Sequence, residues 1–117
     1  MPTFERGDVI KVPFPYTDRN TRQFRPALVV SGSKETLERG IVWVLMITSA
    51  ENRGWTGDVA IRNLEAAGLP APSVIRTAKI ATIDARDAAK LGKVGRSALA
   101  QVLQRMAAEL GIAQSPV

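Results

Sequence analysis

Two side chains in this sequence could bind an anion, and each stands at one end of an apolar run. Arg25 stands directly before Pro26, at the start of an apolar run, and a guanidinium offers five donors in a planar fork that matches phosphate oxygens. Thr48 stands at the far end of a second apolar run, where its hydroxyl could donate to a phosphate oxygen. A surface ion pair and strand packing are the ordinary roles of these residue types. If instead they share a site, they predict binding of a phosphodiester and stabilisation of its transition state.

The composition removes several kinds of chemistry. The chain has no cysteine and no histidine, which excludes disulfides, thiolate sites and the commonest general base. The sequence shows no phosphate-binding loop, dinucleotide fingerprint, metal-ligand spacing or serine-hydrolase elbow, so we expect no metal and no cofactor. With 16 basic and 11 acidic residues the formal net charge is +5, which favours a polyanionic partner, although many basic domains merely stay soluble this way.

Length and hydropathy predict one small cytoplasmic domain. The 117 residues fit a single domain over residues 1–117, because a chain of this size buries roughly 60 to 70% of its unfolded surface. No apolar run reaches the roughly 18 residues of a membrane span, and residues 1–6 carry no signal-peptide core. We therefore expect a soluble protein that needs neither metal nor disulfide to fold.

The first half of the chain predicts three strands. Residues 8–13 should form a strand ended by Pro13 and Pro15, because proline cannot donate to a ladder. Residues 16–24 are expected to be a loop, followed by a strand over 27–31 with Pro26 at its entrance. The β-branched run over 41–49 predicts a central strand. A turn or short helix is expected over 33–39.

The second half predicts short strands and a terminal helix. The expected elements are a loop over 51–57, a strand over 58–61, a loop over 62–72, and one bent strand or two strands joined near Ala78 over 73–83. Asp84 should cap a short helix reaching Lys90. Ser97 should cap an amphipathic helix that Gly111 stops, with an apolar stripe of Leu99, Val102, Leu103, Met106 and Leu110. This order predicts a β-rich α+β domain with a partly closed antiparallel barrel and a C-terminal helix.

Several segments resemble one protein family. The Gly-Asp-Val of residues 7–9, the Pro-Phe-Pro-Tyr-Thr-Asp of 13–18, the Arg-Pro-Ala-Leu-Val-Val of 25–30 and the segment 73–84 resemble the MazF/PemK toxins of type II toxin-antitoxin systems, which cleave single-stranded RNA. The resemblance implies a small SH3-like antiparallel barrel with a terminal helix, and a homodimer with the substrate groove across both subunits. It also implies metal-independent attack of the ribose 2′-hydroxyl on phosphorus.

The resemblance assigns roles to three residues and leaves one role open. Arg25 and Thr48 match the arginine and hydroxyl that face the scissile phosphate, and Arg76 matches an arginine that assists in acid-base chemistry. In some members an aspartate follows two residues later, where this chain has Ala78, which cannot accept a proton. Asp18, Glu51, a water molecule or an electrostatic role of Arg25 could replace it, and Asp18 is the favoured of these.

The segment 14–23 mixes aromatic, amide and basic groups, as in proteins that stack and read unpaired bases. Tyr16 could equally pack under its own loop. Phe14 and Trp43 are expected in the core, whereas Trp55 could meet a base, a partner or its own barrel. The predicted RNA-binding residues are Tyr16, Thr17, Asp18, Asn20, Gln23, Ser49 and Lys79.

The sequence therefore predicts a toxin that cleaves single-stranded RNA, pairs with a second copy of itself and is inhibited by a cognate antitoxin. Two alternatives are a nucleic-acid-binding module without catalysis, which Ala78 keeps open, and a CcdB-like toxin that poisons DNA gyrase. Gyrase-poisoning relatives use a C-terminal Trp-Gly-Ile tail. In this chain Leu110 stands before Gly111 and Ile112, so that tryptophan is missing.

Overall fold

A computed structural model describes residues 3–14, 23–52 and 54–112. None of the helices in these ranges is long and apolar enough to cross a membrane. The elements in chain order are β1 (Asp8–Phe14), β2 (Gln23–Val29), α1 (Lys34–Glu38), β3 (Ile41–Ser49), the 3-10 turn η1 (Ala50–Asn52), β4 (Val59–Ile61), α2 (Leu64–Ala67), β5 (Ser73–Asp84), the 3-10 turn η2 (Ala85–Asp87), β6 (Ala89–Lys93) and α3 (Arg96–Glu109).

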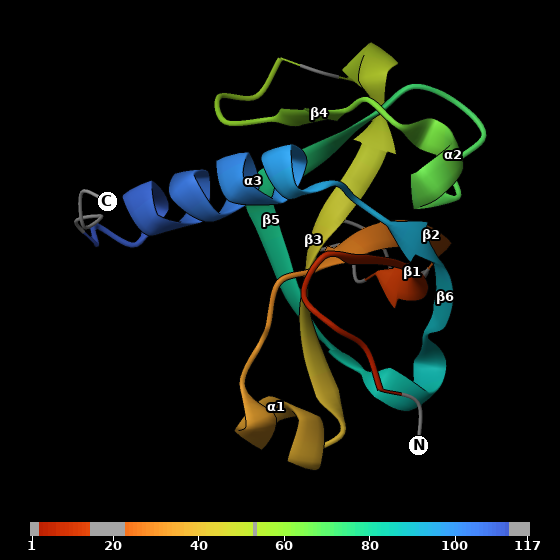
Figure 1. Cartoon of the computed structure of the whole chain (residues 1–117), viewed down its shortest axis with the longest axis vertical. Helices are drawn as coiled ribbons and strands as arrows, with labels where there is room; N and C mark the ends of the chain where they lie inside the picture. Colours follow the sequence, from red (N-terminus) through yellow and green to blue (C-terminus); the bar gives the residue numbers. More distant parts are fainter. Residues whose placement is uncertain (1–2, 15–22, 53, 113–117) are drawn as a thin grey trace.

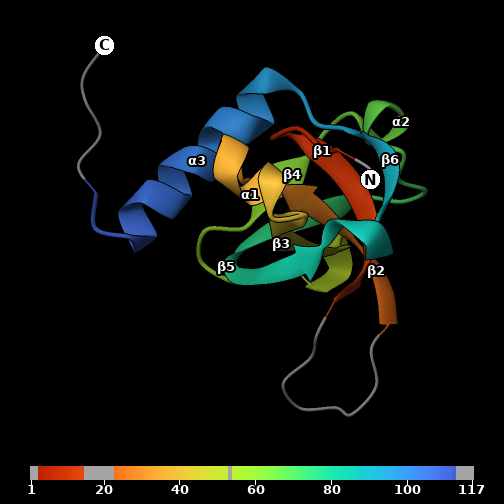
Figure 2. The same ribbon diagram turned by 90° about the horizontal axis from the view of Figure 1, so that it is seen from below.

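The described strands form one antiparallel sheet. Six strands are hydrogen-bonded in the order β4-β5-β3-β2-β1-β6, so the long strands β3 and β5 run through its middle. The sheet curls into a half-barrel, and α3 packs against β4 and β5 on one side of it (Figures 1 and 2). The predicted β-rich fold, a small SH3-like barrel with a C-terminal helix, is confirmed.

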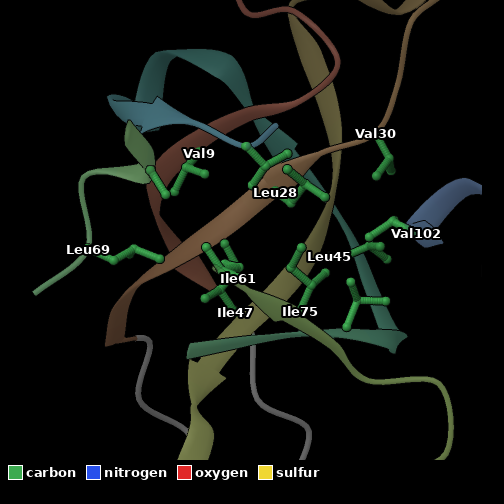
Figure 3. Close-up of a cluster of buried hydrophobic side chains, with 12 residues drawn as sticks. Val9, Leu28, Val30, Leu45, Ile47, Ile61, Leu69, Ile75 and Val102 are labelled. Carbon is green, nitrogen blue, oxygen red and sulfur yellow. The ribbon is translucent and has the colours of Figure 1, made fainter. Parts of the chain in front are cut away.

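The alternation of side chains along the strands divides the core between the two faces of the sheet. Val9, Leu28 and Leu45 are fully buried on the face that α3 covers through Val102 (Figure 3). The next residues along β1, β2 and β3 point the other way and form a second buried cluster. This second cluster includes Ile10, Val12, Ala27, Val29, Val42, Val44 and Met46, closed over by Phe4, Ile83 and Ala85.

The strand β2 begins earlier than predicted. It starts at Gln23 rather than at residue 27 and ends at Val29, so Pro26 lies inside the strand, opposite Lys11. Residues 23–26 pair with β1 alone, while pairing with β3 begins only at Ala27. The strand therefore has an open edge at Pro26, which is the place where a sheet tolerates a proline. Pro13 likewise lies within β1.

The expected helix from Asp84 to Lys90 is wrong. Asp84 ends β5 and accepts a hydrogen bond from the backbone of Arg86, but only the single turn η2 follows before the edge strand β6. The Arg86 side chain donates to the same carboxylate, and this lowers the pKa of Asp84. The cap was thus identified correctly, whereas the extent of the helix was not.

The other boundaries differ in smaller ways. The short helix α2 lies inside the expected loop 62–72, with Asn63 capping it and Gly68 ending it. The helix α3 begins after Gly95 without a side-chain cap, so Ser97 lies in its first turn instead of capping it. At its other end the amides of Gly111 and Ile112 donate to the carbonyls of Ala108 and Ala107, and Gly111 has a φ of 70°, as a Schellman stop requires.

Candidate active site

The alternation of side chains puts Arg25 and Thr48 on one face of the sheet. Ala27 of β2 pairs with Met46 of β3, and both side chains belong to the second buried cluster. Arg25 lies two residues before Ala27 and Thr48 two residues after Met46, so both belong to this face, beyond the last pair of the ladder between β2 and β3. Arg25 is exposed and Thr48 is half-buried, so the buried cluster ends where these two polar side chains begin.

Arg76 belongs to the same face, one strand further across. It pairs with Met46 in the ladder between β3 and β5. Its guanidinium donates from Nε to Oδ1 of Asp58 at 3.2 Å and from Nη2 to Oδ2 at 2.9 Å, and both side chains are only 8% exposed. The register of β4 against β5 explains the contact, because Val59 pairs with Ile75 and Asp58 then falls opposite Arg76. The result is a two-point ion pair removed from water.

Arg76 also holds the segment that joins β3 to β4. Its Nη2 donates a second hydrogen bond to the carbonyl of Asn52, and its Cζ lies 4.4 Å from the centre of the Trp55 ring. The neighbouring Thr77 hydroxyl donates to the carbonyl of Gly57 at 3.0 Å. Two consecutive residues of β5 therefore fix this connecting segment from both ends.

The same segment returns to the end of β3. The side-chain amide of Asn52 donates from Nδ2 to Oγ1 of Thr48 at 3.1 Å. The backbone amide of Glu51 donates to Oγ of Ser49 at 3.3 Å. Thr48 and Ser49, both predicted as site residues, are thus in contact with the turn η1 that follows them.

A bulge changes the faces expected for residues 76–79. The ladder shifts between the Leu45–Ile80 pair and the Met46–Arg76 pair, so Thr77, Ala78 and Lys79 leave the regular register. Simple alternation expects Arg76 and Ala78 on one face, but the structure buries Arg76 and exposes Ala78. Lys79 places its ammonium 5.7 Å from the centre of the Trp55 ring. Of the two alternatives predicted for residues 73–83, the structure shows one strand, Ser73–Asp84.

The remaining predicted residues divide into two groups. Tyr16, Thr17, Asp18 and Asn20 lie outside the described residues, as does the side chain of Phe14, whereas Gln23 begins β2. Trp43, expected in the core, is 46% exposed, since it points to the face of Leu45 where the sheet is incompletely covered. Trp55 is 47% exposed. In residues 3–14, 23–52 and 54–112, no acidic side chains cluster in a way that could hold a metal ion.

Sequence reasoning missed Asp58 and Asn52. One signal was present for Asp58: an arginine expected in the middle of a strand next to apolar residues needs a carboxylate partner, and Asp58 is the acidic residue at the start of the neighbouring strand. For Asn52 no comparable signal exists, because its contact with Thr48 depends on the turn geometry of η1.

Most of this chain matches one protein family. A family model described as the PemK-like, MazF-like toxin of type II toxin-antitoxin systems matches residues 5–110. The chain belongs to this toxin family. No curated protein matched the chain in sequence.

Solved structures of MazF toxins share the fold. MazF from Deinococcus radiodurans superposes with a TM-score of 0.79 at 21% identity, over 96% of this chain and 100% of that one. An endoribonuclease in complex with its cognate antitoxin, from a mycobacterial species, gives a TM-score of 0.75 at 19% identity, over 98% and 100% of the two chains. The Mycobacterium tuberculosis toxin MazF-mt6 gives 0.66 at 19% identity, over 91% and 99%. At these identities the likeness establishes the MazF fold.

The buried ion pair should carry much of the stability of this end of the toxin. Replacing Asp58 by Asn leaves the guanidinium of Arg76 buried without a counter-charge, which should cost about 3 kcal/mol of unfolding free energy. Urea denaturation measures this loss. Asp84→Asn is the matched control, because the Arg86–Asp84 pair has the same 2.9 Å contact but is exposed, and asparagine can still cap η2. Equal losses of unfolding free energy in the two variants would contradict a special contribution of the buried Asp58–Arg76 pair to stability.

Proposed function

We propose that this toxin is an endoribonuclease that cleaves single-stranded RNA, including mRNA, and thereby inhibits translation and growth. The observation that supports the proposal is that Arg25 and Thr48 share the face of the second buried cluster, each two residues beyond Ala27 and Met46 at its end. A guanidinium and a hydroxyl thus stand on one face where the sheet meets solvent. The net charge of +5 adds the electrostatic attraction that an RNA substrate needs.

The proposed reaction is a transesterification that needs no metal. The ribose 2′-oxygen forms a bond to the adjacent phosphorus, and the bond from phosphorus to the 5′-oxygen breaks. The products are a 2′,3′-cyclic phosphate and a 5′-hydroxyl. Arg25 holds the phosphodiester and stabilises the extra negative charge of the phosphorane, while Thr48 donates to a non-bridging oxygen. Arg76 assists from the next strand.

The reaction also moves one proton from the 2′-hydroxyl to the departing 5′-oxygen. Ala78 cannot accept it. Glu51 brings a carboxylate to the turn directly after Thr48 and Ser49, and is therefore a candidate base in the described part of the chain. Asp18, from the segment between β1 and β2, stays the candidate that the sequence favours.

RNA binding is proposed to extend along both sides of the phosphate. Ser49 follows Thr48 at the end of β3, and Lys79 lies in the bulge of β5 after Arg76. Both are proposed to contact RNA, with Lys79 supplying a charge for its backbone. The residues Tyr16, Thr17, Asp18, Asn20 and Gln23 are proposed to contact the bases on the side of Arg25. Base stacking and edge contacts of this kind select unpaired RNA.

We propose two protein partners, the first being a second copy of the chain. Trp43 lines a groove together with Met106, Leu110 and Ile112 of the C-terminal region, and these last two are 70% and 58% exposed. A surface with this many exposed apolar side chains is typical of an interface. Because the MazF/PemK resemblance implies a homodimer, we propose that a second copy of the chain covers this groove.

The second proposed partner is a cognate antitoxin. Two structures with a similar fold are a MazE-MazF complex and an endoribonuclease in complex with its cognate antitoxin. The basic side chains proposed to bind RNA would attract an acidic, initially disordered segment through the same charges. The antitoxin should therefore compete with the substrate.

Replacing Arg25 by Ala should reduce RNA cleavage roughly a hundredfold, because loss of one donor to the transition state costs about 3 kcal/mol. The measurement is cleavage of long single-stranded RNA in the presence of a chelator, with Arg39→Ala as a control at an exposed arginine on α1. Parental activity in Arg25→Ala would show that the site is misplaced. If the parental protein binds RNA without cleaving it, the result would favour the non-catalytic module. If it inhibits gyrase and does not bind RNA, the result would favour the gyrase-poisoning toxin.

The homodimer predicts that Trp43→Asp converts the protein to a monomer, because a charge would be buried in the apolar interface. Sedimentation equilibrium measures the mass directly. Ile80→Asp is the control, since Ile80 is a similarly exposed apolar residue outside this groove. A parental protein that is monomeric at micromolar concentration would refute the interface.

The antitoxin proposal predicts mutually exclusive binding. Titrating a non-cleavable RNA analogue into the toxin-antitoxin complex should displace the antitoxin, and the antitoxin should stop cleavage of normal RNA. Fluorescence anisotropy of labelled RNA follows the exchange. A stable ternary complex with undiminished RNA affinity and undiminished cleavage would show that the antitoxin does not inhibit by occupying the RNA-binding surface.

A further inference from the structure

The contact between Asn52 and Thr48 determines which way the Thr48 hydroxyl can act. A threonine hydroxyl has one proton to donate and two lone pairs that accept. Nδ2 of Asn52 is a donor, and its 3.1 Å hydrogen bond to Oγ1 of Thr48 uses one of those lone pairs. The proton of Thr48 is not consumed by this contact. It is left to be donated to another acceptor on the exposed side of the sheet.

The backbone of Asn52 is held in place from behind. Asn52 is an exposed residue at the end of η1. Its backbone carbonyl accepts from Nη2 of Arg76, and Arg76 is fixed by its two-point ion pair with Asp58. The fold therefore sets the point from which the side-chain amide reaches Thr48, and substrate binding need not order this part of the backbone.

We propose that Asn52 is a positioning residue for the reaction: it turns the Thr48 hydroxyl so that the proton points to the phosphodiester, and the Asp58–Arg76 pair holds Asn52 in the pose that does this. The role rests on the proposed ribonuclease function and deepens it. It also assigns the buried Arg76 a task in the site that requires no proton transfer by its guanidinium.

A double-mutant cycle separates this role from a merely structural one. If Asn52 acts through Thr48, Asn52→Ala should slow single-turnover cleavage about three- to tenfold in the parental protein, the usual effect of one lost hydrogen bond. In a Thr48→Ala background the same change should alter the rate by less than twofold. A residue that only stabilises the turn would slow both backgrounds equally.

Two further measurements sharpen the assignment. Affinity for an RNA with a 2′-deoxy residue at the cleavage position should stay within about twofold in Asn52→Ala, because the amide orients a donor for the transition state and does not carry the affinity. Asn52→Asp should be slower than Asn52→Ala, since a carboxylate would accept the Thr48 proton and turn it away from the phosphate.

The control is Gln101→Ala on α3. Gln101 donates its side-chain amide to the hydroxyl of Ser97, four residues earlier, which repeats the spacing and chemistry of the Asn52–Thr48 contact at an exposed position of α3. It should cleave at the parental rate. Parental cleavage by Asn52→Ala, or an equal loss in both Thr48 backgrounds, would overturn the positioning role while leaving the ribonuclease standing. A parental protein that cleaves no RNA would refute the ribonuclease and this role together.

Discussion

A guanidinium that leaves water needs a carboxylate and hydrogen-bond acceptors for its remaining donors, and this need shapes one end of the sheet. Arg76 meets it with Asp58 and the carbonyl of Asn52, while Trp55 lies over its charge. All three partners lie in the connection between β3 and β4. The described residues of this segment include few apolar side chains, so charge and hydrogen bonds rather than a core hold them against β5.

The position of Arg76 follows from the division of the sheet into two apolar faces. On the face covered by α3 the buried side chains continue along β3 through Ile47, whereas on the opposite face they stop at Met46. The next residue on that opposite face is Thr48. Arg25 of β2 and Arg76 of β5, which pairs with Met46, belong to the same face. Polar groups therefore gather where one apolar cluster ends, although the strands continue.

Different parts of this arrangement could be predicted from the sequence to different degrees. The central strand and the stop of α3 at Gly111 are local features, carried by β-branched runs and a residue that tolerates positive φ, and they were predicted well. The helix after Asp84 was overestimated because a cap shows where a turn starts but not how far it continues. The partner of Arg76 depends on the pairing of β4 with β5, and the contact of Asn52 on the shape of η1. Neither is encoded by nearby residues.

The closeness of the core to the site has a consequence for its electrostatics. Met46 is buried and Thr48 is half-buried only two residues later, so the apolar cluster gives way to solvent at Thr48, whose hydrogen bond with Asn52 is exposed. Fixed donors at such a boundary need little reorganisation when charge develops on a substrate. In the proposed reaction, one exposed arginine and one oriented hydroxyl stabilise the dianionic phosphorane. The acid-base residue of that reaction must then come from another position than 78, because alanine cannot carry a proton.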